Sequence, residues 1–292
     1  MNGRTLYLCA GTQSSGSTLI SWCFLQRHDM DGVLDARFDH LPTVPENLSS
    51  PLPWVKFTIA CFRFNEVMSH FEDEGYTVKP LLVVRDVRSV FNSLIQKKYG
   101  RNGITADDPP IRLRLRRFLE DWRLFREKNW PILKYEDFTQ DAVGHLQKSC
   151  QSFELPWDDA MARWPKKLEQ IADPGFGNET FVLSRGSSLQ ATIKPSLATI
   201  KTEHTPPDDL EWMEREFAEM NAAMGYPAHV PPMANPSLGK RAVPRFENTR
   251  RYERLRRKYR LSRFLSGMST WMKRRPTAPP PSRPASAHPH PE

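Results

Sequence analysis

The sequence predicts an α/β protein with a P-loop-like, doubly wound parallel sheet flanked by helices. Apolar runs of strand length alternate at least four times with segments of helical period, which favours parallel strands joined by helical crossovers. The clearest run, Pro-Leu-Leu-Val-Val at residues 80–84, is continuously apolar, as expected of a strand covered on both faces. A Gly- and Ser-rich loop at residues 11–18 separates the first strand from the first helix and gives the fold its P-loop character.

Strands and helices are expected to alternate through the first half of the chain. The predicted strands are residues 6–10, 54–60, 80–84 and 130–133. The predicted helices are residues 17–27, 62–74, 87–97, 115–125 and 141–153. The many arginines in and around the helix at 115–125 are expected on its solvated face. The polar segment 28–53 contains four prolines, so we expect it to be irregular.

The second half of the sequence predicts less regular structure. Residues 173–205 form a loop-rich stretch of a length that is usually functional or disordered, and 206–224 form one acidic amphipathic helix. The last 17 residues contain seven prolines, which indicates a disordered tail. The expected division is an α/β domain at 1–227, a linker at 228–249, a basic amphipathic helix at 250–275 and a disordered Pro-rich tail at 276–292.

The positive charge is a property of the C-terminal region. Residues 241–275 carry 13 Lys and Arg against 2 Asp and Glu, so with a net charge of +8 overall the remaining residues carry −3. Apolar residues recur at near-helical spacing among the arginines of 252–272, which suits an interfacial helix on an anionic membrane surface. The basic helix could instead pack on the slightly acidic domain, and we do not expect nucleic acid to be the partner.

The four cysteines are spaced widely among apolar neighbours and form no C-x-x-C pair, so they indicate buried thiols in a reducing compartment and no metal site. The N-terminal residues lack the features of a signal peptide, and no run of about 18 uncharged apolar residues occurs. We therefore expect a cytoplasmic protein, peripheral on the inner face of the membrane if the basic helix binds lipid.

The loop at residues 11–18, Gly-Thr-Gln-Ser-Ser-Gly-Ser-Thr, is suited to an anion. Gly11 and Gly16 allow a positive φ and close backbone approach, and the free N–H groups that open a helix favour negative charge. The spacing is that of a P-loop, except that Ser17 stands where a lysine would reach the β- and γ-phosphates. A phosphate or sulfate is expected and a triphosphate is disfavoured, while a Ser/Gly turn that only caps the helix is the alternative.

Polar residues also follow the other predicted strands. Because ligands of doubly wound sheets bind beyond the carboxyl ends of the strands, these groups should meet at one crevice. They are residues 11–18, Lys56, Arg85 with Asp86, and Tyr135 with Glu136.

Three motifs resemble the cytosolic-type and bacterial sulfotransferases that use 3′-phosphoadenosine 5′-phosphosulfate (PAPS). They are the 11–18 loop, the turn Arg85-Asp86-x-x-Ser89-x-x-x-Ser93, and the strand end Tyr135-Glu136-Asp137-Phe138. They occur in the family's order and near its separations, and the resemblance covers residues 4 to 155, with weaker similarity to 225. It implies an enzyme that transfers a sulfuryl group from PAPS to a hydroxyl or amine without a metal.

The resemblance implies a donor site built on two strand-to-helix turns. The first loop would hold the 5′-phosphosulfate through backbone N–H groups and serine and threonine hydroxyls, Arg85 and Ser93 would bind the 3′-phosphate, and Tyr135 would lie near the adenine. The expected donor-binding residues are Gly11, Thr12, Gln13, Ser14, Ser15, Gly16, Ser17, Thr18, Arg85, Ser93, Tyr135 and Arg185.

The sequence departs from the family at the catalytic groups. Many members carry Lys or Arg at the position of Ser14, where it supports the leaving group. Lys56 matches the family's lysine at the end of the second strand and could take this role, or it could be a solvated lysine. The family also needs a base for the acceptor proton. In some bacterial and glycan-modifying members it is a carboxylate soon after the first helix, which corresponds approximately to Asp35, and Thr58 stands where the cytosolic type has histidine. Asp35 is therefore the first candidate and His40 the second, with a plain loop residue as the alternative for either.

Two other functions fit parts of the sequence. A nucleotide-dependent kinase is disfavoured by Ser17 and by the lack of a convincing Mg²⁺-binding aspartate other than Asp86. A catalytically degenerate nucleotide-binding protein at a membrane surface would explain Ser14 and the basic helix. The segments 28–53, 98–112 and 173–205 would line the acceptor side, and they suggest a saccharide or glycolipid without excluding a phenol or another lipid.

Overall fold

The computed structural model describes residues 4–36, 40–96, 111–164, 166–167, 170–172, 189–193, 199–228 and Arg257. The chain divides into two compact units, residues 1–252 and 253–292, and every described residue except Arg257 belongs to the first. The predicted linker, basic helix and Pro-rich tail lie outside the described residues, apart from Ala228 and Arg257.

A parallel sheet of five strands forms the centre of the first unit, in the order β2-β3-β1-β4-β5. The strands are β1 (Arg4–Gly11), β2 (Met30–Ala36), β3 (Leu52–Thr58), β4 (Tyr76–Val84) and β5 (Ile132–Lys134). Gly11, the last residue of the central strand, lies opposite Thr58 of β3 and Val83 of β4. The carboxyl ends of these strands therefore meet at one edge, and the predicted α/β fold class is confirmed.

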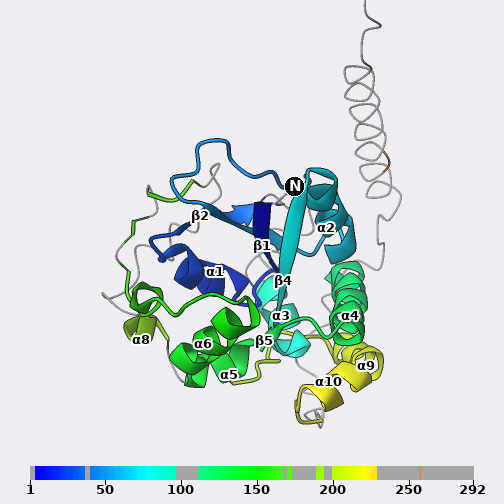
Figure 1. The fold of residues 1–292 in the computed structure, drawn as a ribbon. Helices are drawn as coiled ribbons and strands as arrows, with labels where there is room; N and C mark the ends of the chain where they lie inside the picture. Colours follow the sequence, from blue (N-terminus) through cyan, green and yellow to red (C-terminus); the bar gives the residue numbers. More distant parts are fainter. Residues whose placement is uncertain are drawn as a thin grey trace, which may run out of the picture. The chain divides into compact units, whose positions relative to one another are not determined.

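Helices cover both faces of this sheet (Figure 1). They are α1 (Ser17–Leu25), α2 (Phe64–Asp73), α3 (Val87–Leu94), α4 (Ile111–Glu127), α5 (Tyr135–Gln140), α6 (Ala142–Ser152), the 3-10 helix η2 (Asp159–Ala162), α8 (Leu189–Thr192), α9 (Pro207–Glu216) and α10 (Ala218–Ala223). In the described part of the chain no helix combines the length and the apolar character needed to cross a bilayer.

Aromatic side chains fill the layers on either side of β3. On one face Phe24 of α1 stacks on Trp54, with ring centroids 4.3 Å apart. On the other face Phe64 of α2 packs on Phe57 of β3 at 5.9 Å and on Phe125 of α4 at 4.7 Å. Strand β3 is thus buried on both faces by α1 on one side and by α2 and α4 on the other, which explains its apolar composition.

Local signals set several helix ends. The carboxylates of Asp86 and Asp141 cap α3 and α6 by accepting hydrogen bonds of 2.9 Å from the backbone N–H groups of Arg88 and Gly144. Helix α2 ends before Gly75, whose φ of +87° is the left-handed conformation that glycine adopts easily.

Strand β2 corrects the prediction that 28–53 is irregular throughout. The strand contains Asp31, which is buried, so its polar composition concealed it from an apolar pattern. The Asp31 carboxylate accepts hydrogen bonds from the backbone N–H groups of Gly32, Ser49 and Ala172 at 2.8, 2.9 and 2.8 Å. Burial alone would raise the pKa of Asp31, but the Ser49 hydroxyl, which donates at 2.7 Å, and these backbone bonds outweigh it and hold the pKa below its usual value.

Two helical predictions also change in detail. The residues after β5 form the short helix α5 where the sequence suggested the end of a strand. The single helix expected at 206–224 is divided into α9 and α10 at Phe217, whose φ of −104° and ψ of 12° leave the helical range. The four cysteines, all within the described residues, are thiols outside any disulfide and are buried, as expected.

Candidate functional site

The loop between β1 and α1 is shaped by two close approaches. A Cβ on Gly11 would lie 2.5 Å from the Ser15 Oγ, and a Cβ on Gly16 would lie 2.2 Å from the Tyr135 ring. The expected positive φ occurs at Gly16, at +88°, and also at Ser14, at +68°. Gly11 does not have a positive φ, so only its lack of a side chain explains its place here.

The beginning of α1 has the features of an anion site. The helix begins at Ser17 after Gly16 and receives no side-chain cap, which leaves first-turn N–H groups for another acceptor. The Ser15 side chain is fully buried, and its Oγ has no hydrogen-bond partner in the described structure. A buried hydroxyl without a partner is costly, and an oxyanion in the loop would remove that cost.

Arg85 joins the second strand-to-helix turn to this loop. Its guanidinium donates a 2.9 Å hydrogen bond to the carbonyl oxygen of Ser14 and lies 4.9 Å from the centroid of the Tyr135 ring. Tyr135 in turn covers Gly16. Burial raises the pKa of Tyr135 although Arg85 opposes the shift, so the phenol stays neutral. The three sequence motifs are thus in contact around Ser14 and Gly16.

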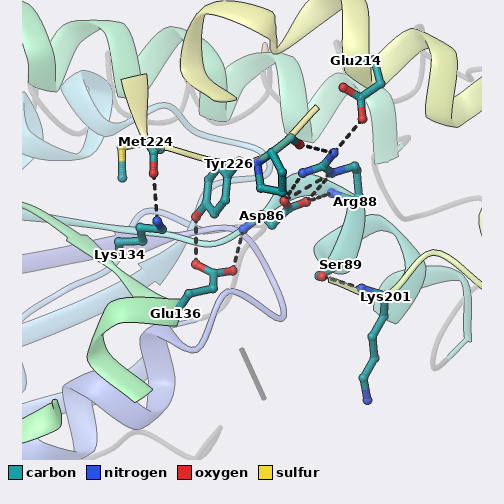
Figure 2. A network of polar contacts seen from close by, with 10 residues as sticks. Asp86, Arg88, Ser89, Lys134, Glu136, Lys201, Glu214, Met224 and Tyr226 are labelled. Carbon is teal, nitrogen blue, oxygen red and sulfur yellow. Dashed lines mark hydrogen bonds and ion pairs between the residues drawn. The ribbon is translucent and has the colours of Figure 1, made fainter. Parts of the chain in front are cut away.

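A buried polar network fixes the turn that carries Arg85 (Figure 2). The backbone N–H of Asp86 donates to Glu136 at 3.0 Å, and the hydroxyl of Tyr226 donates to the other oxygen of Glu136 at 2.8 Å. The Arg88 guanidinium bonds to the Asp86 carboxylate and, at 2.8 Å, to Glu214 of α9. The C-terminal segment of the domain therefore supports the residue next to Arg85.

Burial is the main influence on the pKa of Glu136. It raises the pKa of this carboxyl, and the hydrogen bonds from Asp86 and Tyr226 oppose the shift. Burial beside Glu136 also raises the pKa of Tyr226, which keeps the phenol as the donor. Nothing in the sequence links Tyr226 to this turn, because the two are far apart in the chain.

The proposed catalytic pair, Lys56 and Asp35, forms an ion pair at 2.6 Å across β3 and β2. The Lys56 side chain is 3% exposed, which excludes the alternative of a solvated lysine, whereas the Asp35 side chain is 34% exposed. The ammonium also donates to the Thr58 hydroxyl at 3.1 Å. His40, the second candidate base, is an exposed residue beyond the end of β2.

Two arginines of α4 correct the prediction of a solvated basic face. Arg116 and Arg123 are exposed as expected, but Arg114 and Arg117 are 2% and 5% exposed. Arg117 donates 2.7 Å hydrogen bonds to the carbonyl oxygens of residues 60 and 61, beyond the end of β3. Arg114 donates a 3.1 Å hydrogen bond to the side-chain oxygen of Gln13 in the anion loop.

The sequence pattern alone does not identify these two arginines as buried. Positions 114, 117 and 121 share one face of the helix, and Asp121 on that face is also buried. The exposed charged residues Arg116, Glu120 and Arg123 repeat at similar spacing on the same helix, so the pattern does not distinguish the buried face from the solvated one.

The last expected donor residues belong to α3 and to the segment after it. Ser93 is half-buried on α3. One turn earlier, Ser89 accepts a 3.0 Å hydrogen bond from the backbone N–H of Lys201, whose side chain is exposed. Figure 2 shows the Lys201 side chain extending away from this contact. Arg185 lies outside the described residues.

Among the described residues, one group of potential metal ligands, His28, Asp29 and Asp158, lies beyond the C-terminal end of α1, away from the crevice. Both Asp29 oxygens already accept from the Arg27 guanidinium at 2.8 Å, and Asp158 accepts from His28 and Ala160. The cluster is therefore satisfied as a set of ion pairs and hydrogen bonds.

No family model matches the chain, and no curated protein matches it. Among solved structures it is similar to the sulfotransferase domain of the olefin synthase of Synechococcus PCC 7002, with a TM-score of 0.54, 16% identity, and coverage of 78% of this chain and 95% of that domain. It is also similar to the sulfotransferase domain of the curacin biosynthetic pathway, with a TM-score of 0.51, 14% identity, and coverage of 77% and 99%. The chain therefore has a sulfotransferase-like fold, as its three motifs predict.

Proposed function

We propose that the protein transfers the sulfuryl group of PAPS to a hydroxyl or amine of an acceptor. One observation carries this proposal: Arg85 reaches from the second strand-to-helix turn to the carbonyl of Ser14, so two candidate anion sites adjoin. PAPS carries a phosphate at one end and a phosphosulfate at the other, and it therefore needs two such sites. The likeness to sulfotransferase domains supports the same conclusion at the level of the fold.

The residues of the crevice suit PAPS better than ATP. The buried Ser15 hydroxyl and the uncapped start of α1 would hold the phosphosulfate, together with the hydroxyls of Ser17 and Thr18. Ser17 stands where a P-loop lysine would reach a triphosphate. Arg85, with Ser93 as its neighbour, would bind the 3′-phosphate as a bidentate fork, and Tyr135 would lie beside the adenine; Arg185 is proposed for the same site.

The ion pair of Lys56 and Asp35 provides a route for the acceptor proton. Asp35 would accept that proton as the acceptor oxygen or nitrogen attacks sulfur and the bond from sulfur to the bridging oxygen breaks. The product is then 3′-phosphoadenosine 5′-phosphate (PAP), with the sulfuryl group on the acceptor. Lys56 holds the Asp35 carboxylate in place through their ion pair, and its charge would support the leaving group once Asp35 has taken the proton. His40 remains the second candidate base.

We infer a polar acceptor such as a saccharide or glycolipid. Asp35 is partly exposed near the end of β2, and the segment that follows this strand contains polar residues, among them His40, Glu46 and Asn47. The basic helix proposed at 250–275 would attach the enzyme to an anionic membrane surface on the cytoplasmic side, where a lipid-linked acceptor would be present.

The experiment that tests the proposed function is transfer from PAPS labelled in the sulfuryl group to a panel of saccharides, glycolipids and phenols. We expect labelled product with at least one polar acceptor, and none from Asp35→Asn. Transfer of labelled phosphate from ATP under the same conditions would instead indicate a kinase. Absence of any transfer, together with absence of PAP binding, would contradict the proposal.

A further inference from the structure

The anion loop contains no cationic side chain. Residues 11–18 are glycine, threonine, glutamine and serine throughout, so the loop offers N–H groups and hydroxyls alone. A phosphosulfate is negatively charged, and charge builds up on its bridging oxygen as sulfur leaves. Burying such a group without a nearby cation is costly. Under the proposed function, the positive charge must come from other elements of the chain.

Two arginines from other elements hydrogen-bond to the loop in the described structure. Arg85 contacts the carbonyl oxygen of Ser14 and lies over the Tyr135 ring, in the position proposed for the nucleotide end. Arg114 contacts the Gln13 side chain at 3.1 Å, on the helix α4 side of the loop. The ammonium of Lys56 is already engaged by Asp35 at 2.6 Å.

Helix α4 is held beside the sheet at the level of Arg114. Arg117, one turn further along α4, holds the helix to the chain beyond β3 through its two 2.7 Å bonds to backbone carbonyl oxygens. Arg114 is 2% exposed, so its guanidinium is directed into the protein and not into solvent. A buried guanidinium that already hydrogen-bonds to the anion loop is placed to meet a charge that arrives with a ligand.

We propose that Arg114 supplies the cation that the loop lacks and contacts the sulfuryl end of PAPS. Gln13 holds the guanidinium in place before the donor binds. This inference rests on the proposed function and adds a residue to its donor site. Because PAP lacks the sulfuryl group, removing Arg114 should weaken binding of PAPS far more than binding of PAP.

The test compares PAPS and PAP by titration calorimetry, without acceptor, for the wild-type protein, Arg114→Met and Arg116→Met. Arg116 lies on the same helix, is 47% exposed and pairs with Glu216 at 3.4 Å, so it is a matched control. We expect Arg114→Met to lose roughly tenfold in affinity for PAPS and less than about threefold for PAP, since a hydrogen bond to a charged group is lost only with PAPS. Arg116→Met should bind both nucleotides as the wild type does.

A rescue distinguishes this role from a structural one. Adding Ser14→Lys to Arg114→Met restores a cation to the loop and should recover most of the lost affinity for PAPS. An equal loss for both nucleotides, or no rescue in a double variant with the wild-type circular dichroism spectrum, would overturn the inference.

Two further outcomes separate the inference from the proposed function. If the wild type binds both nucleotides and Arg114→Met binds each of them as tightly as the wild type does, the inference fails and the proposed function stands. A loss of turnover without a loss of nucleotide affinity would then indicate that Arg114 contacts the acceptor and not PAPS. If the wild type binds neither nucleotide, both fail.

Discussion

The ammonium of Lys56 lies 2.6 Å from the carboxylate of Asp35, so a residue of β3 and a residue of β2 share one ion pair at the carboxyl edge of the sheet. Lys56 is almost fully buried and Asp35 is only partly so. Removing Asp35 should therefore cost more stability than removing Lys56, because a buried charge without a partner costs more than an exposed one.

The first prediction follows from this asymmetry. Lys56→Met should lower turnover more than affinity for PAP, because its charge acts mainly in the transition state. Asp35→Asn should also lower turnover and in addition reduce stability, because it leaves the Lys56 ammonium buried without its carboxylate. Steady-state kinetics with a good acceptor, PAP calorimetry and urea unfolding give the three quantities. Wild-type turnover in both variants would remove these residues from the mechanism.

The second prediction concerns the network behind Arg85. Tyr226→Phe removes the donor to Glu136, and the loss should weaken PAP binding severalfold while turnover at saturating donor changes little. The stability cost should be about 1–3 kcal/mol, as for a buried acceptor left unsatisfied. Tyr76→Phe is the matched control, since Tyr76 is a buried tyrosine at the other end of β4. The network has no positioning role if the two variants bind PAP alike.

The third prediction is a pH dependence of stability. Burial raises the pKa of Asp121 to about 7 from 3.8, although the Phe64 N–H and Arg63 oppose the shift. Between these values the folded state holds a proton that the unfolded state has lost, so this contribution to stability is present at low pH and disappears as pH rises through 7.

Asp121→Asn should therefore be more stable, relative to the wild type, at about pH 8 than at about pH 5, because asparagine stays neutral while its oxygen can still accept from Phe64. Urea unfolding at the two pH values measures the difference. The same offset between the proteins at both values would show that the Asp121 pKa is not raised.

The fourth prediction concerns the basic segment at 250–275. The full-length protein should sediment with anionic vesicles and not with neutral ones, because its arginines gain only from anionic lipid. A truncation after Gly239 should stay in the supernatant in both cases. Failure of the full-length protein to sediment with anionic vesicles at low salt would leave the segment as a packing or oligomer contact.

Much of the fold could be predicted because its signals are local. The apolar run of β4 and the Gly16 turn both follow from a few adjacent residues, and the alternation of strands and helices indicates a parallel sheet. Strand β2 could not be found in this way. Its buried Asp31 is satisfied by Ser49 and Ala172, which a pattern of apolar residues does not reveal.

The candidate site also has one part that the sequence predicts and one part that it does not. The motifs around Ser14, Arg85 and Tyr135 each occupy a short stretch, and parallel topology brings them to one edge. The contacts of Arg114 with Gln13 and of Tyr226 with Glu136 join segments far apart in sequence. Such contacts depend on how helices pack on the sheet, so they become visible only in the folded structure.

The most direct test of the proposed function is calorimetry of PAP and of adenosine 5′-phosphate with the wild-type protein and Arg85→Ala. PAP should bind the wild type much more tightly, because it alone carries the 3′-phosphate. Arg85→Ala should weaken PAP by about 2–4 kcal/mol, as expected for removing the charged partner of a buried anion, and should change adenosine 5′-phosphate far less. Equal affinities of the wild type for the two nucleotides would contradict a PAPS-dependent function.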